Sequence, residues 1–326
     1  MADQLRVGIV GIGIIAQTHL EVLAEDERFT VSFTVDPHRD EPVDFRGTRP
    51  PHYPALHDAL DAHDPHLVVI ATPTEAHAAL AVQALTGSAG RVLVEKPLVH
   101  TRSALARLHA LDPTADVRGR LLTAHHFAFS PEVRWAADQL AAHPEWGPIT
   151  SVTSAFYDPY VLRGQQAFDS YVSSWMDSGV NQLSVLARLV ELTGPVTGSQ
   201  ADGGASAWYT AAYTSRGTTG TARLRSSWHT GTSSKETVVT FAESGVEMWI
   251  DHTAMTGFAA RNSELLSTHG SDGRTPRKIA HYRPLYDSIA SGTPDAVLGF
   301  PTAVQITELH HVAGAAEVGI LDPRDG

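Results

Sequence analysis

The chain has 326 residues, of which 42% are hydrophobic and 18% charged, and this length suffices for two domains with cores of their own. The formal net charge of −12 argues against nucleic acid or an anionic membrane as a partner, and no stretch has the length and apolarity of a membrane span. The lack of cysteine excludes disulfides and thiolate chemistry. Because the first predicted strand starts too early to leave room for a signal peptide, we expect a cytoplasmic protein.

The first predicted strand, Leu5 to Val10, leads into Gly11-Ile12-Gly13-Ile14-Ile15-Ala16, which matches the dinucleotide-binding pattern G-x-G-x-x-G/A. Apolar residues at helical spacing predict a helix directly after it. In such a turn the first glycine permits the tight bend, the second leaves room for a pyrophosphate, and the start of the helix offers N–H groups to the phosphates. The expected cofactor contacts here are Gly11, Gly13, Ile14 and Ile15.

The second predicted strand, Phe29 to Val35, ends at Asp36, at the spacing expected of the acid that binds an adenosine ribose. A carboxylate at that position accepts hydrogen bonds from both ribose hydroxyls and repels a 2′-phosphate, which favours NAD. His38 and Arg39 keep NADP as an alternative, because an arginine just past the acid can stack on adenine or pair with a phosphate.

Residues 37–54 are rich in proline and polar residues and are predicted to be a loop, followed by a short helix over 55–62. A third strand over 67–71 and a helix over 74–85 come next. Ligands of open α/β sheets bind outside the carboxyl ends of the strands, so this strand end faces the cofactor as well. The residues expected to contact the cofactor there are Thr72, Pro73 and His77.

A fourth strand, Arg91 to Val94, ends in Glu95-Lys96-Pro97. A lysine at the carboxyl end of a parallel strand beside a dinucleotide site is where a substrate hydroxyl or carbonyl would meet the nicotinamide. The following proline restricts Lys96 toward an extended backbone. An ordinary surface lysine is the alternative, although the chain has only three lysines. We expect Glu95 and Lys96 to contact the cofactor.

The remaining pattern predicts a helix over 101–111, a strand over 120–127 and a helix over 130–142, so that a Rossmann-like parallel sheet is complete near residue 122. We therefore place the dinucleotide-binding domain at 1–122 and a substrate-binding and oligomerisation domain at 123–326. From residue 149 on, strand-like segments follow one another, which predicts an open, mostly antiparallel sheet. The expected segments are strands at 149–157, 196–205, 207–213, 220–228, 237–242 and 245–252, helices at 178–192, 283–291 and 302–319, and an exposed loop at 263–276.

Asp177 lies at the predicted helix start and Asn181 four residues on, hence on the same face. In one interpretation Asp177 is a helix cap and Asn181 an ordinary helix residue. In the other, Asp177 is a general base and Asn181 an amide that positions the substrate.

The dinucleotide motif, Glu95-Lys96-Pro97 and Asp177-x-Gly179-x-Asn181, in this order and spacing, resemble the glucose–fructose oxidoreductase and inositol dehydrogenase (Gfo/Idh/MocA) family. The resemblance covers essentially the whole chain. It implies an N-terminal doubly wound Rossmann domain, a C-terminal α/β domain on an open sheet, a nicotinamide cofactor, and catalytic groups in an Asp-x-Gly-x-His segment. Asn181 stands where many members have histidine. Since an asparagine cannot exchange protons near neutral pH, the acid–base task moves to Asp177 or Lys96.

The stretch from Asp177 to Ser184 is similar to the branch of aldose 1-dehydrogenases that act on L-arabinose or D-galactose. That similarity implies oxidation of a ring hemiacetal at C1 to a lactone by hydride transfer to NAD or NADP. The residues that it assigns are Lys96, Asp177 and Asn181 for catalysis and His125 near the substrate. Trp175 and Trp228 are candidates for offering ring faces to a sugar, and burial in the core is the alternative for both.

Two other functions stay open at this point. A family dehydrogenase of this fold can act on a ring secondary alcohol, as the inositol-type members do, or the chain can be a non-catalytic NAD-binding sensor. The 18 histidines are scattered without a zinc-binding spacing, so we expect structural histidines and no metal site. An open sheet with one bare face predicts a homo-oligomer, either a dimer or a tetramer.

Overall fold

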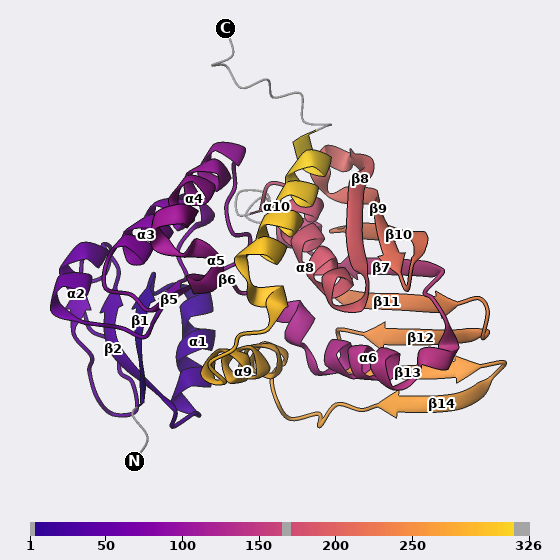
Figure 1. Ribbon diagram of the computed structural model, residues 1–326, viewed down its shortest axis with the longest axis horizontal. Coiled ribbons are helices and arrows are strands. Elements are labelled where there is room, and N and C mark those ends of the chain that lie inside the picture. The colour runs from indigo at the N-terminus through magenta and orange to yellow at the C-terminus, as the bar shows by residue number, and fades with distance from the viewer. Residues whose placement is uncertain (1–3, 165–170, 316–326) are drawn as a thin grey trace, which may run out of the picture. The chain divides into compact units, whose positions relative to one another are not determined.

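The computed structural model describes residues 4–164 and 171–315 (Figure 1). Contacts within the chain divide it into two compact units. Unit 1 consists of residues 1–125 and 278–307, and unit 2 of residues 126–277 together with the chain from 308 on. The chain changes from unit 1 to unit 2 after residue 125, and residues 278–307 return to unit 1.

Unit 1 contains a six-stranded sheet of order β3-β2-β1-β4-β5-β6, in which all neighbouring strands are parallel. This is the strand order of doubly wound dinucleotide-binding domains, and it confirms the predicted fold class. The central strands are buried on both faces, which explains their continuous apolar runs. The strands are β1 Leu5–Val10, β2 Phe29–Val35, β3 His52–Tyr53, β4 Leu67–Ile70, β5 Arg91–Val94 and β6 Leu121–Thr123.

Helices cover both faces of this sheet. On one face, residues such as Val68 and Ile70 form a core with Leu85 of α3 and Leu105 of α4. On the other face, Phe29 packs edge to face against Tyr286 of α9, with ring centroids 5.4 Å apart. The helices of unit 1 are α1 Ile14–Ala24, α2 Leu56–Ala62, α3 Thr74–Thr86, α4 Arg102–Ala115, α5 Val117–Arg120 and α9 Arg277–Ala290, together with α10 Phe300–Ala315 as far as residue 307.

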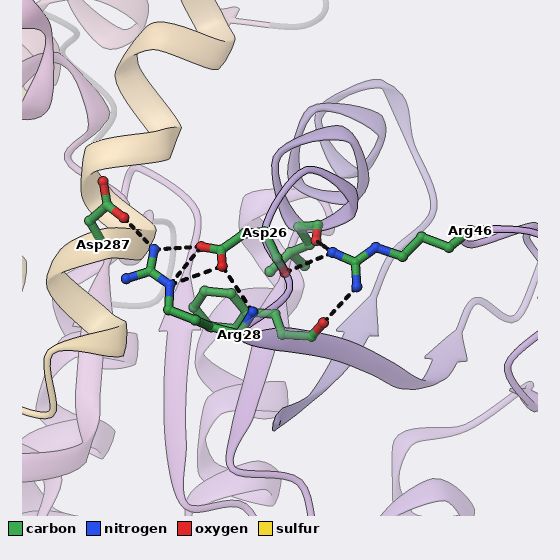
Figure 2. A network of polar contacts seen from close by, with 6 residues as sticks. Asp26, Arg28, Arg46 and Asp287 are labelled. Atoms are coloured by element: carbon green, nitrogen blue, oxygen red, sulfur yellow. Dashed lines mark hydrogen bonds and ion pairs between the residues drawn. The ribbon is translucent and has the colours of Figure 1, made fainter. Parts of the chain in front are cut away.

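The loop between β2 and β3 is fixed to the carboxyl end of α1 by Arg46 (Figure 2). Its guanidinium donates hydrogen bonds to the carbonyl oxygens of Leu23 and Ala24, at 2.7 and 2.8 Å, and to those of Asp26 and Phe29, at 2.7 and 3.1 Å. The last turn of α1 has no basic residue of its own. Arg46 therefore supplies the positive charge that the carboxyl end of a helix favours.

Replacing Arg46 with alanine is expected to lower the free energy of unfolding of unit 1 by about 1–2 kcal/mol, because four carbonyl groups lose a charged donor at a site open to solvent. Urea unfolding followed by circular dichroism measures the change. Arg49→Ala is the matched control, since Arg49 is exposed on the same loop. Equal effects of the two substitutions would contradict the capping role.

A second arginine ties α9 to the start of β2. Arg28 pairs with Asp26, at 2.5 Å between Nη2 and Oδ2, and also with Asp287 of α9 (Figure 2). This contact holds part of the returning segment 278–307 on unit 1.

Unit 2 contains an eight-stranded sheet of order β14-β13-β12-β11-β7-β10-β9-β8. All of its pairs are antiparallel except β7 with β10, as the mostly antiparallel prediction requires. Helices α6 and α8 pack against one face of this sheet (Figure 1). The elements are α6 Pro131–Ala142, β7 Ser151–Tyr157, α8 Ser174–Leu189, β8 Glu191–Ala201, β9 Ser206–Ser215, β10 Thr218–Ser227, β11 Ser234–Phe241, β12 Val246–Asp251, β13 Thr256–Arg261 and β14 Glu264–His269.

The predicted loop over 263–276 is wrong in its first part, because residues 264–269 form the edge strand β14. Most of its side chains are exposed, so it lacks the apolar alternation by which a strand is recognised. Its backbone pairs with β13 through a tight turn at Asn262 and Ser263, both at positive φ.

Several predicted boundaries also shift. The strand expected over 120–127 ends at Thr123 and a 3₁₀ turn, His126–Phe129, follows it. Helix α9 begins at Arg277 rather than 283 and includes Pro284, and the two-residue strand β3 lies inside the predicted loop over 37–54. The helix expected to end near 319 is described as far as Ala315, and its remaining residues lie outside the described part of the chain. Within the two described ranges, no helix is long and apolar enough to cross a membrane.

Candidate active site

Unit 1 has a pocket of about 650 Å³ at the carboxyl ends of its strands. Its wall is formed by the turn between β1 and α1, the ends of β2 and β4, residues 54–57, and α3 as far as Gln83. Five of the predicted cofactor residues lie in this wall: Gly11, Gly13, Asp36, Thr72 and Pro73. The other five, Ile14, Ile15, His77, Glu95 and Lys96, lie outside it.

Asp36 extends from the end of β2 into the wall of the pocket. Its two carboxylate oxygens accept hydrogen bonds from the N–H groups of Ile12 and His38, both at 2.9 Å. Partial burial acts to raise the pKa of Asp36, but these two hydrogen bonds outweigh it and hold the pKa below its usual value. An ionised carboxylate has about four acceptor positions. The two that remain are available to a pair of ribose hydroxyls.

The two glycines of the β1–α1 turn differ in backbone conformation and in the space around them. Gly11 has a φ of +84°, and a Cβ there would lie 2.8 Å from the carbonyl oxygen of Ala71. Gly13 has an ordinary φ of −80°, and a Cβ there would meet nothing within 4 Å. The fold therefore requires glycine at position 11, whereas at position 13 it leaves open space beside the uncapped start of α1. Open space at a helix start is what an approaching pyrophosphate needs.

This difference predicts opposite outcomes for two similar substitutions. Gly13→Ala is expected to leave the free energy of unfolding unchanged within about 0.5 kcal/mol and to weaken NAD binding about tenfold or more, because the methyl group occupies phosphate space. Gly11→Ala is expected to destabilise unit 1 itself, since an alanine there is strained and collides with backbone. Thermal unfolding and NAD titration of both variants separate the two effects. Unchanged NAD affinity in Gly13→Ala would contradict the phosphate assignment.

Thr72 and His77 fix the segment that follows β4. The hydroxyl oxygen of Thr72 is buried without a hydrogen-bond partner among the described residues, so it remains available to a ligand. His77 is buried, and its ring nitrogens lie 2.9 Å from the carbonyl oxygens of Thr72 and Pro97. Burial lowers the pKa of His77 despite these contacts. His77 thus links the ends of β4 and β5 and acts on the cofactor wall indirectly.

Glu95 is turned into unit 1 rather than toward the pocket. Its Oε1 contacts Nε2 of His19 at 3.0 Å and the hydroxyl of Tyr282 at 2.5 Å, and its Oε2 accepts the N–H of Lys96 at 3.1 Å. His19 in turn contacts the hydroxyl of Tyr286 at 2.7 Å. Burial acts to raise the pKa of Glu95, but these partners outweigh it and lower the pKa. This buried network joins α1, β5 and α9 and fixes the backbone at Lys96.

His125 follows β6 and is 2% exposed. Both of its ring nitrogens are buried without a hydrogen-bond partner among the described residues. Burial lowers its pKa to about 4, so the imidazole is neutral at pH 7 and carries one donor and one acceptor. The charges of Glu95 and Lys96 act on it in opposite directions. Lys96 and His125 therefore belong to one region of unit 1, at the carboxyl ends of β5 and β6.

In unit 2, Asp177 lies in the first turn of α8. The cap of this helix is Ser173, whose hydroxyl oxygen accepts the N–H of Met176 at 3.2 Å. The interpretation of Asp177 as the cap is therefore wrong, and its carboxylate is not needed for that purpose. Asn181 is 7% exposed, and its amide donates to the carbonyl oxygen of Asp177 at 3.2 Å. The contact between the two residues thus joins the side-chain amide of Asn181 to the main chain of Asp177.

Helix α8 is fixed over the only parallel strand pair of the described part of unit 2. The buried side-chain amide of Gln182 donates to the carbonyl oxygens of Ser154 in β7 and Arg225 in β10, at 3.1 and 3.0 Å. Nearer the start of the helix, the hydroxyls of Ser226 and Ser174 are 3.0 Å apart. The first turn of α8 consequently lies near the carboxyl ends of β7 and β10.

Trp175 and Trp228 are both 1% exposed. The ring of Trp175 stacks on Tyr209 with a centroid distance of 4.0 Å, and its N–H donates to the carbonyl oxygen of His310 at 3.2 Å. Trp228 packs against Tyr160 at 5.7 Å. The core alternative thus describes both residues, and the structure offers no exposed ring face for the sugar contact that was predicted.

Residues 5–126 match the model of an oxidoreductase family. That model, Gfo/Idh/MocA, is described as an oxidoreductase family with an NAD-binding Rossmann fold, and the matched residues span β1 to the 3₁₀ turn after β6. This is the family to which the sequence motifs bear a resemblance. The match thus assigns an NAD-binding Rossmann fold to residues 5–126. A search among curated proteins finds no match.

Solved structures that share the fold cover nearly the whole chain. An oxidoreductase from Agrobacterium radiobacter in complex with NAD⁺, L-tartaric acid and magnesium is 13% identical, covers 96% of each chain and has a TM-score of 0.75. UDP-N-acetylglucosamine 3-dehydrogenase GnnA from Acidithiobacillus ferrooxidans is 18% identical, with coverage of 97% of this chain and 98% of that one and a TM-score of 0.72. Levoglucosan dehydrogenase in complex with NADH and levoglucosan is 15% identical, covers 96% of each chain and has a TM-score of 0.76. These similarities establish a fold common to both units.

The residues of the pocket fit NAD. The open position beside Gly13 suits a pyrophosphate, the remaining acceptors of Asp36 suit the ribose hydroxyls, and the buried hydroxyl of Thr72 lacks a partner in the described chain. Two features were missed by sequence reasoning, namely the contribution of residues 54–57 to the pocket wall and the partners of Glu95 on α1 and α9. The apolar spacing of residues 283–291 predicts a helix where α9 lies. This spacing does not indicate that the helix packs on the sheet of unit 1.

Proposed function

We propose that the protein is an NAD-dependent dehydrogenase that oxidises the ring hemiacetal of an aldose at C1 and releases the lactone. The observation that carries the proposal is the combination of an NAD-type pocket in unit 1 with a carboxylate, Asp177, that the start of α8 does not use for capping. A dehydrogenase of this kind needs a hydride acceptor and a base for the hydroxyl proton. When bound, NAD supplies the first.

In this proposal Asp177 accepts the proton of the C1 hydroxyl while C1 loses its hydride. Asn181, held by its bond to the carbonyl oxygen of Asp177, positions the same hydroxyl, and Lys96 donates a second hydrogen bond to it. Such fixed donors align the reacting C–H bond rather than exchange protons. The neutral imidazole of His125, with both nitrogens buried and unpaired in the described chain, contributes one further hydrogen bond to a substrate hydroxyl.

Oxidation of a ring secondary alcohol is the second candidate, and the structural similarity to a nucleotide-sugar 3-dehydrogenase favours it. The replacement of the family histidine by Asn181 favours C1 instead. A hemiacetal hydroxyl is more acidic than an ordinary ring alcohol, so a carboxylate is a sufficient base for it. A non-catalytic sensor is the third possibility.

The experiment is the appearance of NADH when the protein is mixed with NAD and a panel of aldoses, polyols and inositols. Turnover with L-arabinose, D-galactose or a related aldose supports the proposal. Turnover with inositols alone supports the secondary-alcohol candidate. Tight NAD binding without turnover of any panel member overturns the proposal in favour of a sensor.

We also propose that the face of the unit 2 sheet opposite α6 and α8 binds a second copy of the chain, giving a dimer or tetramer. The large side chains Trp208, Trp249 and Phe258 on β9, β12 and β13 are 46, 40 and 40% exposed. Alternate residues of β12 and β13 are buried, which places the exposed ones on one face. An apolar sheet face of this kind is typical of an interface. Sedimentation equilibrium measures the mass, and a monomer at micromolar concentration would overturn this proposal.

A further inference from the structure

Lys235 and Asp158 form a buried ion pair in unit 2 that the proposed chemistry does not use. Lys235 lies in β11, and Asp158 follows the last residue of β7, the strand paired with it. The ammonium Nζ lies 2.5 Å from Oδ1 of Asp158 and 3.0 Å from the hydroxyl of Ser233, which itself donates to Asp158 Oδ1 at 2.9 Å. The side chains of the lysine and aspartate are only 6 and 10% exposed.

Stability alone does not explain this pair. Moving two charges out of water costs more than their attraction commonly returns, and apolar residues of similar volume often serve the fold as well or better. Burial lowers the pKa of Lys235, which is the direction that removal of an ammonium from water produces. The chain has only three lysines, and one of them is buried in a strand. We therefore look for a function of Lys235 besides packing.

The pair has hydrogen-bonding capacity left over. An ammonium has three N–H groups, and two of them are directed to Asp158 and Ser233. Within the described residues, Nζ of Lys235 makes no third hydrogen bond and lies 6.0 Å from the centre of the Phe156 ring, and Oδ2 of Asp158 accepts no hydrogen bond. One donor and one acceptor therefore stand side by side. Two hydroxyls on neighbouring carbons match this arrangement, because one can donate to the carboxylate while the other accepts from the ammonium.

The pair also lies at the end of unit 2 that holds Asp177. Asp158 follows β7, and the hydrogen bonds of Gln182 and of Ser174 fix the start of α8 over the ends of β7 and β10. Asp177 and Arg277 are close enough for their charges to act on Lys235. The charges of these two carboxylates and two cations cancel. A neutral group of charges disfavours a phosphate or carboxylate ligand and suits an uncharged polyol.

We propose that Lys235 and Asp158 bind a vicinal diol of an uncharged sugar substrate, and thereby set the substrate class. The proposal rests on the proposed function for the identity of the reaction, but it concerns binding and is tested by binding. It assigns the two side chains to specificity and leaves the proton transfer to Asp177.

The test uses the full chain saturated with NAD and measures sugar affinity by titration calorimetry. The probes are D-galactose and L-arabinose, the 2-, 3- and 4-deoxy forms of galactose, and galacturonate as an anionic comparison. The variant is Asp158→Asn combined with Lys235→Met, which removes both charges together so that no unpaired charge is buried. Lys278→Met is the matched control, because Lys278 is an exposed lysine at the start of α9.

The wild-type chain is expected to bind an intact sugar at least about tenfold more tightly than one of the deoxy forms, and more tightly than galacturonate. The double variant is expected to retain NAD affinity and thermal stability, to bind the intact sugar about tenfold more weakly, and to lose the preference over that deoxy form. The control variant Lys278→Met is expected to keep the wild-type affinity for the intact sugar and the preference over the deoxy form. The proposal is overturned if the double variant discriminates as well as the wild type, if galacturonate binds most tightly, or if no probe binds.

The two proposals fail in distinguishable ways. Sugar binding that depends on Lys235 and Asp158 without NADH formation would overturn the proposed dehydrogenase and leave the diol site standing. NADH formation with equal KM for the sugar in the wild type and the double variant would overturn the diol site and leave the proposed dehydrogenase standing. If the double variant does not fold, Ser233→Ala, which removes only the hydroxyl that supports the pair, is expected to weaken sugar binding several-fold without changing NAD affinity, and unchanged sugar affinity overturns the proposal.

Discussion

Asp177→Asn is expected to lower kcat for the oxidised sugar by about a thousandfold, within the range that removal of a general base produces. The amide keeps the shape of the side chain but cannot take up the hydroxyl proton. Because Ser173 caps α8, the substitution leaves the helix start intact, and NAD affinity stays at the wild-type value. Initial rates of NADH formation and NAD titration by tryptophan fluorescence measure both quantities.

The control for this prediction is Asp138→Asn, which makes the same chemical change at an exposed position of α6. It is expected to retain full turnover. The base assignment fails if Asp177→Asn keeps a rate near that of the wild type, or if both variants lose activity alike.

Asp36→Asn is expected to weaken NAD binding by about 10- to 100-fold, which corresponds to the loss of charged hydrogen bonds to the ribose, and to leave NADP binding equal or stronger. The pKa of Asp36 lies below its usual value, so the carboxylate is ionised at neutral pH. A lowered pKa in the folded state means that its favourable contacts are present above the ordinary pKa of 3.8 and are lost as the pH falls through the lowered value. NAD affinity should accordingly be constant from pH 6 to 8.

Parallel titrations of the wild type and the variant with NAD and NADP check this prediction. Glu75→Gln is a suitable control, because Glu75 also lines the pocket but comes from α3. Equal weakening of both cofactors in Asp36→Asn would contradict the ribose contact and favour a merely structural role of Asp36 in holding the N–H groups of Ile12 and His38.

The features of unit 1 that could be predicted from the sequence are those that depend on residues close together in the chain. Short apolar runs mark β1, β2, β4 and β5, because strands buried on both faces need apolar residues throughout. Gly11 and Gly13 were identified by spacing, and the structure gives a separate physical reason for each. Asp36 follows from its distance along the chain, since the strand that carries it has a fixed place beside β1.

What could not be predicted depends on contacts between distant segments. Glu95 was expected at the cofactor, but its partners His19, Tyr282 and Tyr286 come from α1 and α9, and no local pattern reports that these meet. The same holds for Lys235 and Asp158, whose strands are adjacent in the sheet but far apart in the chain. The rarity of lysine was the one available signal. Strand β14 was not predicted, because exposed edge strands lack the alternation of apolar and polar residues that packing on a core requires.

The central claim is that hydride leaves C1 of a sugar. The most direct measurement is the mass of the reduced cofactor formed from NAD and an aldose, D-galactose or L-arabinose, that carries deuterium at C1. Our account predicts that the deuterium appears in the NADH, that the rate falls on deuteration, and that the lactone is the product. NADH of ordinary mass, with the deuterium retained in the oxidised sugar, would contradict it and assign the reaction to a ring secondary alcohol.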